Sequence, residues 1–220
     1  MLEVRKAAVV RSVPQKDGPG DTIEATPLES GGSMARQTGK ENIQRAFLRL
    51  LAREAYSGIS VKEIAAEAGI SRTSYYRHYY AQQDVLDDII KSVMAEVDGL
   101  RVEMLRTAGD DMGERVVLYR MLQVIKEHAD DLKIIHDSDA AFHLATAMHR
   151  YLLDVTTSSF PPPTDEREEK RQARVRHYHA VGIAAIIFDW IDKRCEDPLT
   201  DVVDFLIETQ RSSPLRLKRT

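Results

Sequence analysis

The sequence predicts an all-α protein with two domains, a small three-helix N-terminal domain that contains a helix-turn-helix and a larger helical body. Apolar residues recur at spacings of three and four along most of the 220 residues, which is the period of amphipathic helices. No stretch of useful length alternates apolar and polar residues as a half-buried strand does. Between Ser60 and Tyr80, a glycine separates two short helical patterns, which is the arrangement of a helix-turn-helix.

The composition is typical of a globular protein that works in the cytoplasm. Hydrophobic residues make up 43% of the chain and charged residues 30%. Cys195 is the only cysteine, so no disulfide can form within the chain, and this suits a reducing compartment. The longest apolar run, residues 180–188, is too short to span a bilayer, and the N-terminus lacks the apolar segment of a signal peptide.

Charge is distributed unevenly along the chain. The net charge is −4, but residues 34–84 contain 8 basic and 5 acidic residues, a net of +3. The rest of the chain contains 23 basic and 30 acidic residues, a net of −7. A basic end on an acidic body suits a protein that docks one face on phosphates.

Residues 1–33 are predicted to be a disordered tail, because prolines, glycines and scattered charges interrupt any helical period there. The first helix is expected from about Thr38 to Tyr56, where Ser57-Gly58 ends it. One face of this helix is apolar at i, i+3, i+4, i+7 and i+8. The residues of this face are Ile43, Ala46, Phe47, Leu50 and Leu51.

The helix-turn-helix begins at Ser60. The side chains of Ser60 and Glu63 can each accept a hydrogen bond from a free amide at the helix start, which is a capping box. Gly69 can adopt the left-handed conformation that ends a helix. Ser71 is then a good N-cap for a second helix, which is predicted to run to about Tyr80. The second helix of such a pair can lie in a DNA major groove.

This second helix carries polar groups on too many sides to be wholly buried. Residues 72–78 offer donors, acceptors and aromatic edges over two turns. Phosphate oxygens accept hydrogen bonds from such donors, and base edges pair with short or planar polar groups near a helix start. The alternative is an ordinary amphipathic hairpin with its aromatic residues inside, and we expect Tyr79 to be packed in that way.

The stretch IAAEAGISRTSYYRHYYAQQDVL resembles the signature of the TetR/AcrR transcriptional regulators. Tyr79 stands where Phe is usual in that family, and Ser74-Tyr75 stand where Thr-Leu is common. Gln82 replaces a Lys that often touches a phosphate. The direct matches are Ile64-Ala65, Ala68-Gly69, Ser71, Tyr76, His78 and Leu86.

The resemblance implies a set of DNA-binding residues in the head. Arg72 and Thr73, with Tyr75 or Tyr76, are expected to contact base edges. The residues expected on phosphates are Ser60, Lys62, Ser74, Tyr76 and His78, and the set is completed by Ser71 and Gln82. A dimer of such heads would bind a palindromic operator with half-sites about one helical turn apart or slightly more.

Asp84 to about Arg106 is predicted to form one long helix, since apolar residues continue at helical spacing until Gly109-Asp110. In the family, this fourth helix links the DNA-binding head to the ligand-binding body. We therefore divide the folded chain into a DNA-binding head, residues 34–84, and an effector-binding and dimerisation body, residues 85–212.

The body is predicted to contain five further helical segments. The first three are Glu114–Glu127, Leu132–Ile135 and Ser138 to Leu152. Prolines 161–163 cannot continue a helix, because they lack N–H donors and have a fixed φ. Thr164 or Asp165 caps a long helix that is charged at first and apolar from Val181. Asp197-Pro198 is expected to start the last helix, with proline at its first position.

The two C-terminal helices are more apolar than one domain requires. In the family, they pair with their mates across a two-fold axis as a four-helix bundle, although burial in the core of one chain is the alternative for each residue. The residues expected at this dimer interface are Ile183, Ile187, Trp190, Leu199, Val203 and Leu206.

An effector pocket is expected among the middle helices, because pockets in helical bundles are mostly apolar with a few placed polar groups. An apolar or amphipathic small molecule is the expected effector. Residues that only fill the core are the alternative. The residues expected to line the pocket are Tyr119, Phe142, Met148, Tyr151 and Tyr178.

The sequence predicts no enzyme, no metal and no cofactor. Glycine-rich phosphate motifs are absent. His143 and His149 lie six positions apart, which does not place them on one helical face, and His177 and His179 point to opposite sides of a helix. Cys195 beside Arg194 is a possible thiol sensor, and a passive residue at a helix end is the favoured interpretation.

The expected function is that of a ligand-responsive repressor that binds a palindromic operator as a homodimer. Ligand would shift the population toward dimers whose heads are wrongly spaced for DNA. One alternative is a protein of this type that acts through a protein partner as a co-activator, which the missing Lys at Gln82 suggests. The other is a helical ligand-binding protein that does not bind DNA.

Overall fold

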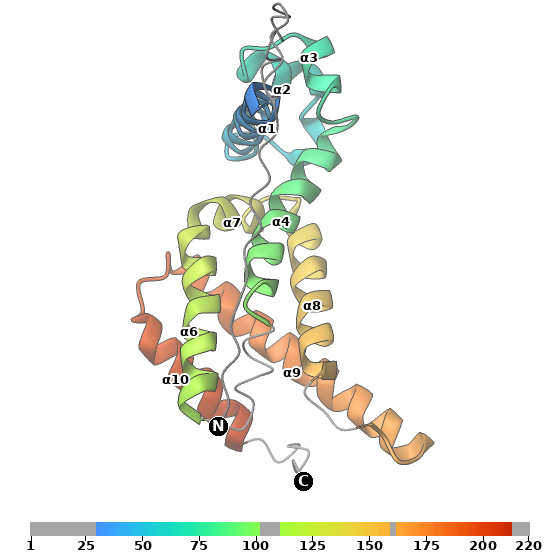
Figure 1. Cartoon of the computed structure of the whole chain (residues 1–220), viewed down its shortest axis with the longest axis vertical. Coiled ribbons are helices and arrows are strands. Elements are labelled where there is room, and N and C mark those ends of the chain that lie inside the picture. Colours follow the sequence, from blue (N-terminus) through green and yellow to red (C-terminus); the bar gives the residue numbers. More distant parts are fainter. Residues whose placement is uncertain (1–29, 102–110, 159–161, 213–220) are drawn as a thin grey trace, which may run out of the picture.

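The computed structural model describes residues 30–101, 111–158 and 162–212. Over these ranges the chain is helical and contains no strand, as the hydrophobic period predicts. Figure 1 shows a head made by the first three helices at one end of the molecule and a bundle of longer helices at the other. No helix in these ranges combines the length and the apolar character that crossing a membrane requires.

The head consists of α1 (Ser30–Leu51), α2 (Val61–Glu67) and α3 (Arg72–Tyr76), closed by the start of α4 (Gln82–Asp98). One core holds these elements together, since each contributes side chains that are completely buried. These side chains include Ile43 and Phe47 from α1, Ile64 from α2, Tyr75 from α3 and Leu86 from α4.

Both predicted ends of the first helix are wrong. Helix α1 begins at Ser30, so the last four residues of the predicted tail are helical, and residues 1–29 lie outside the described residues. The helix ends at Leu51, and a 3₁₀ turn follows at Tyr56–Gly58. The ring of Tyr56 packs edge-on against Phe47, with centroids 6.3 Å apart. A continuous helix would separate these nine positions by about 13 Å, so the chain must leave the helix first.

Asp88 joins α1 to α4 inside the head. Its Oδ2 accepts hydrogen bonds from Lys40 Nζ at 3.0 Å, Gln44 Nε2 at 2.9 Å and the Tyr79 hydroxyl at 2.7 Å. Burial opposes ionisation, but the hydrogen bonds from Tyr79 and Lys40 outweigh it and lower the pKa of Asp88. The expected burial of Tyr79 is therefore confirmed, and its hydroxyl has a partner that a phenylalanine would leave unbonded.

The body consists of the rest of α4 together with α6 (Asp111–Glu127), α7 (Ala129–His136), α8 (Ala141–Ser158), α9 (Glu166–Asp192) and α10 (Leu199–Ser212). Helix α4 enters the body and contacts both α6 and α8, while α9 packs on α8 and α10 packs on α6 (Figure 1). The predicted long fourth helix ends early, at Asp98, where Gly99 is the C-cap. Positions 102–106 of that prediction lie outside the described residues.

The ends of the two C-terminal helices depend on local hydrogen bonds. The carboxylate of Asp165 accepts from the Glu168 amide at 2.7 Å, which confirms the predicted cap of α9. Helix α10 begins at Leu199, one position later than predicted. The indole N–H of Trp190 donates to the Asp197 carbonyl at 3.1 Å. This bond fixes the turn before α10, so the helix begins after Pro198.

Cys195 lies in this same turn and is buried. Burial is the main cause that raises the pKa of its thiol. A protonated, enclosed thiol is a poor nucleophile, so the passive interpretation of Cys195 is the better one.

Candidate nucleic-acid interface

The α2–turn–α3 unit is built by short-range hydrogen bonds. The Ser60 hydroxyl accepts from the Glu63 amide at 3.3 Å, and Glu63 Oε2 accepts from the Ser60 amide at 2.8 Å, which confirms the capping box. Gly69 has φ +69°, the left-handed conformation that its lack of a Cβ permits. The Ser71 hydroxyl accepts from the Ser74 amide at 3.1 Å and caps α3.

Helix α3 is shorter than predicted and ends at Tyr76 rather than at Tyr80. The reason lies in the start of α4, where Asp84 Oδ2 accepts hydrogen bonds from the amides of Tyr80 at 2.8 Å and Ala81 at 2.9 Å. These bonds take the amides away from a continued α3 and turn the chain. The turn allows the Tyr79 side chain to reach the core.

The exposed side of α3 carries most of the predicted DNA-binding residues at the far end of the head (Figure 1). Arg72 and Thr73 occupy the first turn and are exposed, and Tyr76 is 45% exposed. Among the described residues, Arg72 has no hydrogen-bond or salt-bridge partner. Ser71, the N-cap of α3, is exposed, and Ser74 and His78 are half-buried. Ser60 and Lys62 are exposed at the start of α2.

His78 lies against α1. A Cβ added at Gly39 would stand 3.0 Å from His78 Nε2, so glycine at this position leaves room for the imidazole. The side chain is therefore held between the end of the helix-turn-helix and α1, at the edge of the exposed face.

The structure contradicts one predicted base contact and shows a partner within the protein for one predicted phosphate contact. Tyr75 is completely buried, and its hydroxyl donates to the Ala81 carbonyl at 3.0 Å, so its side chain faces the core and cannot reach a base. Gln82 is half-buried, and its Nε2 donates to the Tyr56 carbonyl at 3.0 Å. This hydrogen bond occupies one N–H of its amide, and the phosphate contact of Gln82 stays a prediction.

Two exposed residues of this surface were missing from the predicted set. The side chain of Arg77 is exposed and has no hydrogen-bond or salt-bridge partner within the described part of the chain, and Tyr80 is 86% exposed. The positive charge of Arg77 next to Tyr76 is a sequence feature that could have marked it as a candidate phosphate contact. Tyr79 was expected inside, at the position where Phe is usual in the TetR/AcrR signature, but no pattern assigned a place to Tyr80, whose exposure depends on the turn after α3.

Replacing Tyr75 with phenylalanine is expected to lower the free energy of unfolding by about 1 kcal/mol, the net value of one hydrogen bond, and to leave DNA sequence preference unchanged. The ring would keep its buried place, and only the bond to the Ala81 carbonyl would be lost. Urea unfolding measures the first effect, and binding to a panel of single-base operator variants measures the second. An altered base preference would contradict the inward orientation of Tyr75.

The predicted pocket residues divide into two groups. Met148 is buried, and the Tyr151 hydroxyl is buried without a hydrogen-bond partner in the described ranges. Burial raises the pKa of Tyr151. Phe142 is 76% exposed and Tyr119 also faces solvent, so the expectation that these two point inward is wrong. Tyr178 is 62% exposed, but it lines an open groove between α9 and α10. All three lie off the buried stripes of their helices.

The predicted dimer residues are mostly part of the core of one chain. Half-buried Ile183 is the exception. Neighbouring helices cover the others, which are Ile187, Trp190, Leu199, Val203 and Leu206. Burial within one chain leaves these five residues little surface for a partner, which contradicts their prediction as interface contacts.

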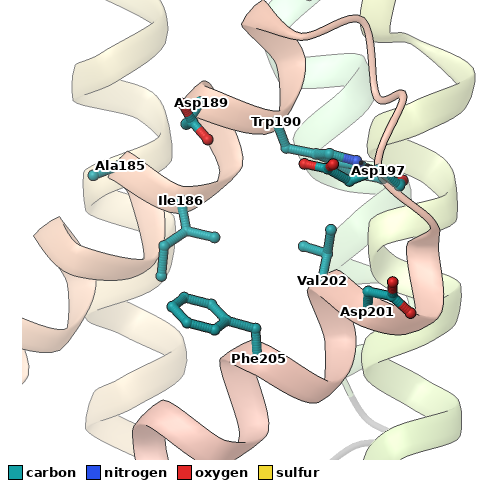
Figure 2. Close-up of a pocket in the computed structure, with 8 residues that line it drawn as sticks. All are labelled: Ala185, Ile186, Asp189, Trp190, Asp197, Asp201, Val202 and Phe205. Carbon is teal, nitrogen blue, oxygen red and sulfur yellow. Dashed lines mark hydrogen bonds between the residues drawn. The ribbon is translucent and has the colours of Figure 1, made fainter.

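Exposed apolar side chains of α9 and α10 border the same surface. Phe205 is 55% exposed and borders two open grooves of about 430 Å³ and 480 Å³ between the helices. Figure 2 shows Phe205, Ile186 and Val202 around the first groove, with Asp189 and Asp201 at its rim. Tyr178 lines the second groove. We call this surface the α9–α10 face.

The chain is similar to known bacterial regulators. Residues 43–89 match the family model described as bacterial regulatory proteins, tetR family. Over 59 residues the chain is 34% identical to an uncharacterized HTH-type transcriptional regulator, YxbF, of Bacillus subtilis strain 168. The match covers 26% of this chain and 16% of that protein.

Solved structures share the fold over most of the chain. The dihydroxyacetone kinase operon activator DhaS is 20% identical, with a TM-score of 0.52 over 78% of this chain and 95% of the other. A TetR transcriptional regulator from Streptococcus agalactiae 2603V is 16% identical, with a TM-score of 0.53 over 81% of this chain and 97% of the other. Both likenesses extend through the body and support the all-helical, two-part architecture.

Proposed function

We propose that this chain, whose residues 43–89 match the family model of the tetR bacterial regulatory proteins, belongs to that family and is a transcriptional regulator that reads DNA with α3. The observation that carries the proposal is the first turn of α3. There Arg72 and Thr73 are exposed at the end of a head whose core and Asp88 network hold the helix in place. A rigid scaffold that presents unpaired polar groups near a helix start suits base-edge readout.

The exposed residues of the head receive separate roles in this proposal. Arg72 and Thr73 contact base edges, with Tyr76 beside them. Arg77 and the exposed or half-buried polar residues contact phosphates, which position the protein without reading sequence. These residues are Ser60, Lys62, Ser71, Ser74, Tyr76 and His78.

A second copy of the chain is proposed to cover the α9–α10 face, which would present two heads to a palindromic operator. A large exposed aromatic side chain between two grooves is typical of a surface that another protein covers. In this arrangement the head ends near residue 84, and the body from residue 85 supplies the dimer contacts. The boundary falls inside α4, so one helix belongs to both parts.

The body is proposed to bind an apolar or amphipathic small molecule beside Met148 and Tyr151. A buried hydroxyl without a partner costs about 1–3 kcal/mol, and a ligand that hydrogen-bonds to it would recover part of that cost. Ligand binding would favour a conformation that DNA does not select, so the protein would repress transcription until the ligand arrives. It would act in the cytoplasm as a regulator and not as an enzyme.

Fluorescence anisotropy with the purified full chain and DNA from its own upstream intergenic region tests this function. Binding is expected to be selective over random DNA, and the log–log slope against salt should change by about 0.9 for each phosphate contact. Affinity no better than for random DNA would overturn the proposal and favour action through a protein partner.

A further inference from the structure

The head and the body meet at the 3₁₀ turn Tyr56–Gly58. Asp139 lies between α7 and α8 of the body, and its carboxylate accepts hydrogen bonds from two backbone amides of this turn. The Tyr56 amide lies 2.5 Å from Oδ1, and the Ser57 amide lies 3.3 Å from Oδ2. The contact joins residues 83 and 82 positions apart in the chain.

Tyr56 is held from both sides of this junction. Its ring packs edge-on against Phe47 of α1 at a centroid distance of 6.3 Å and against His143 of α8 at 5.7 Å. Its carbonyl accepts the hydrogen bond from Gln82, the first residue of α4. The peptide groups of Tyr56 are thus bonded to the body on the N–H side and to α4 on the carbonyl side.

The hydrogen bonds of the Asp139 carboxylate to other residues go to the Tyr56–Gly58 turn. The hydrogen bond from the Tyr56 amide is the main cause that lowers the pKa of Asp139, with the bonds to Ser57 adding to it, so the group is ionised at neutral pH. Hydrogen bonds to an ionised acceptor are stronger than neutral ones. No Lys, Arg or His side chain forms a salt bridge with Asp139 in the parts of the chain that the structure describes.

We propose that Asp139 is a positioning residue that fixes the orientation of the DNA-reading head on the body and transmits movement of α8 to it. The proposal rests on the proposed function of the head. Asp139 precedes α8 by two residues, and α8 carries Met148 and Tyr151, the residues proposed to meet the ligand. A shift of α8 along its axis by about 2 Å would carry Asp139 out of hydrogen-bond reach of the Tyr56 amide, and helix shifts of about 1–2 Å occur at switching interfaces.

Gln82 links the Tyr56 turn to α4. The tetR-like signature has Lys at this position where the present chain has Gln, and the shorter amide side chain reaches the Tyr56 carbonyl. Movement of the Tyr56 turn would therefore displace the first turn of α4, which directly follows the helix-turn-helix. Loss of the Asp139 contact would let heads adopt many orientations, of which few match the operator, and this lowers the apparent affinity.

The test compares Asp139→Ala with Asp137→Asn in the full chain. Asp137 lies in the same corner but pairs with Lys133 at 2.9 Å and does not contact the head, so its variant controls for loss of one negative charge. Amide hydrogen exchange of Tyr56 and Ser57 and operator affinity by anisotropy are measured for both variants. Thermal unfolding and the exchange of α3 show whether the head itself is intact.

We expect Asp139→Ala to accelerate exchange at Tyr56 and Ser57 and to weaken operator binding by about 10-fold, the value of one charge-assisted hydrogen bond, while Asp137→Asn changes neither. Asp139→Asn should fall between the two, since it keeps one acceptor oxygen. Faster exchange with unchanged or tighter operator binding would overturn the inference and leave the proposed function standing. Wild-type protein that does not prefer its own upstream DNA would overturn both.

Discussion

Replacing Arg72 with alanine is expected to weaken operator binding by roughly 10- to 100-fold and to relax base preference at one position of each half-site. Arg72 is exposed in the first turn of α3 and lacks a partner in the described chain, so its guanidinium is available for a guanine edge. One well-placed bidentate contact discriminates between bases by about 1–3 kcal/mol. The double variant Arg72→Ala with Tyr76→Ala is expected to lose more, because Tyr76 lies on the same exposed side.

Arg45→Ala is the matched control for this prediction. Arg45 is an exposed arginine of α1 in the same head, pairs only loosely with Glu41 at 3.8 Å, and carries the same charge. Anisotropy with operator DNA and with random DNA separates the two variants, since Arg72→Ala should reduce the first far more than the second. An equal loss on both DNAs would make Arg72 a phosphate contact. In-cell regulation that survives the double variant would instead favour the partner-dependent alternative.

Phe205→Glu is expected to convert the proposed dimer into a monomer. The Phe205 ring is 55% exposed and borders both grooves of the α9–α10 face, so a second copy that covers this face must bury it. A carboxylate at the same place would be desolvated without a cationic partner and beside Asp201, which lies at the rim of the same groove. Light scattering coupled to size-exclusion chromatography measures the mass of the variant.

The same variant should bind operator DNA much more weakly, by about 100-fold or more, because a monomer loses the high effective concentration of the second head. Phe142→Glu is the matched control, since Phe142 is equally apolar and 76% exposed but lies at the start of α8 and lines neither groove. It should remain a dimer. A Phe205→Glu protein that stays dimeric would place the dimer contact on another surface.

The features that were predicted correctly depend on residues close together in the chain. The capping box joins Ser60 to Glu63, and Asp165 caps α9 through Glu168, each across three positions. Gly69 needs only its own lack of a Cβ to adopt φ +69°. Interactions of this range are readable without a tertiary structure, because the partners are already neighbours in the chain.

The side chains of the candidate site were harder to place, since residue type does not say which face is covered. Tyr75 and Tyr76 have the same chemistry, but the core of the head takes Tyr75 and leaves Tyr76 outside. On α9 and α10, Trp190 and Phe205 are both large and apolar, and residue type does not say that Trp190 is buried and Phe205 is exposed. The packing of the helices of the body makes that choice.

The sequence alone therefore determined the helical class, the helix-turn-helix and its caps, because these follow from local spacing and residue type. Only the tertiary structure decided that Tyr75 faces the core, which apolar residues of α9 and α10 remain open, and that Gln82 and Asp139 meet at Tyr56. These contacts join residues 26 and 83 positions apart. No local pattern encodes them, because they exist only once the packing of the whole chain has brought the head onto the body.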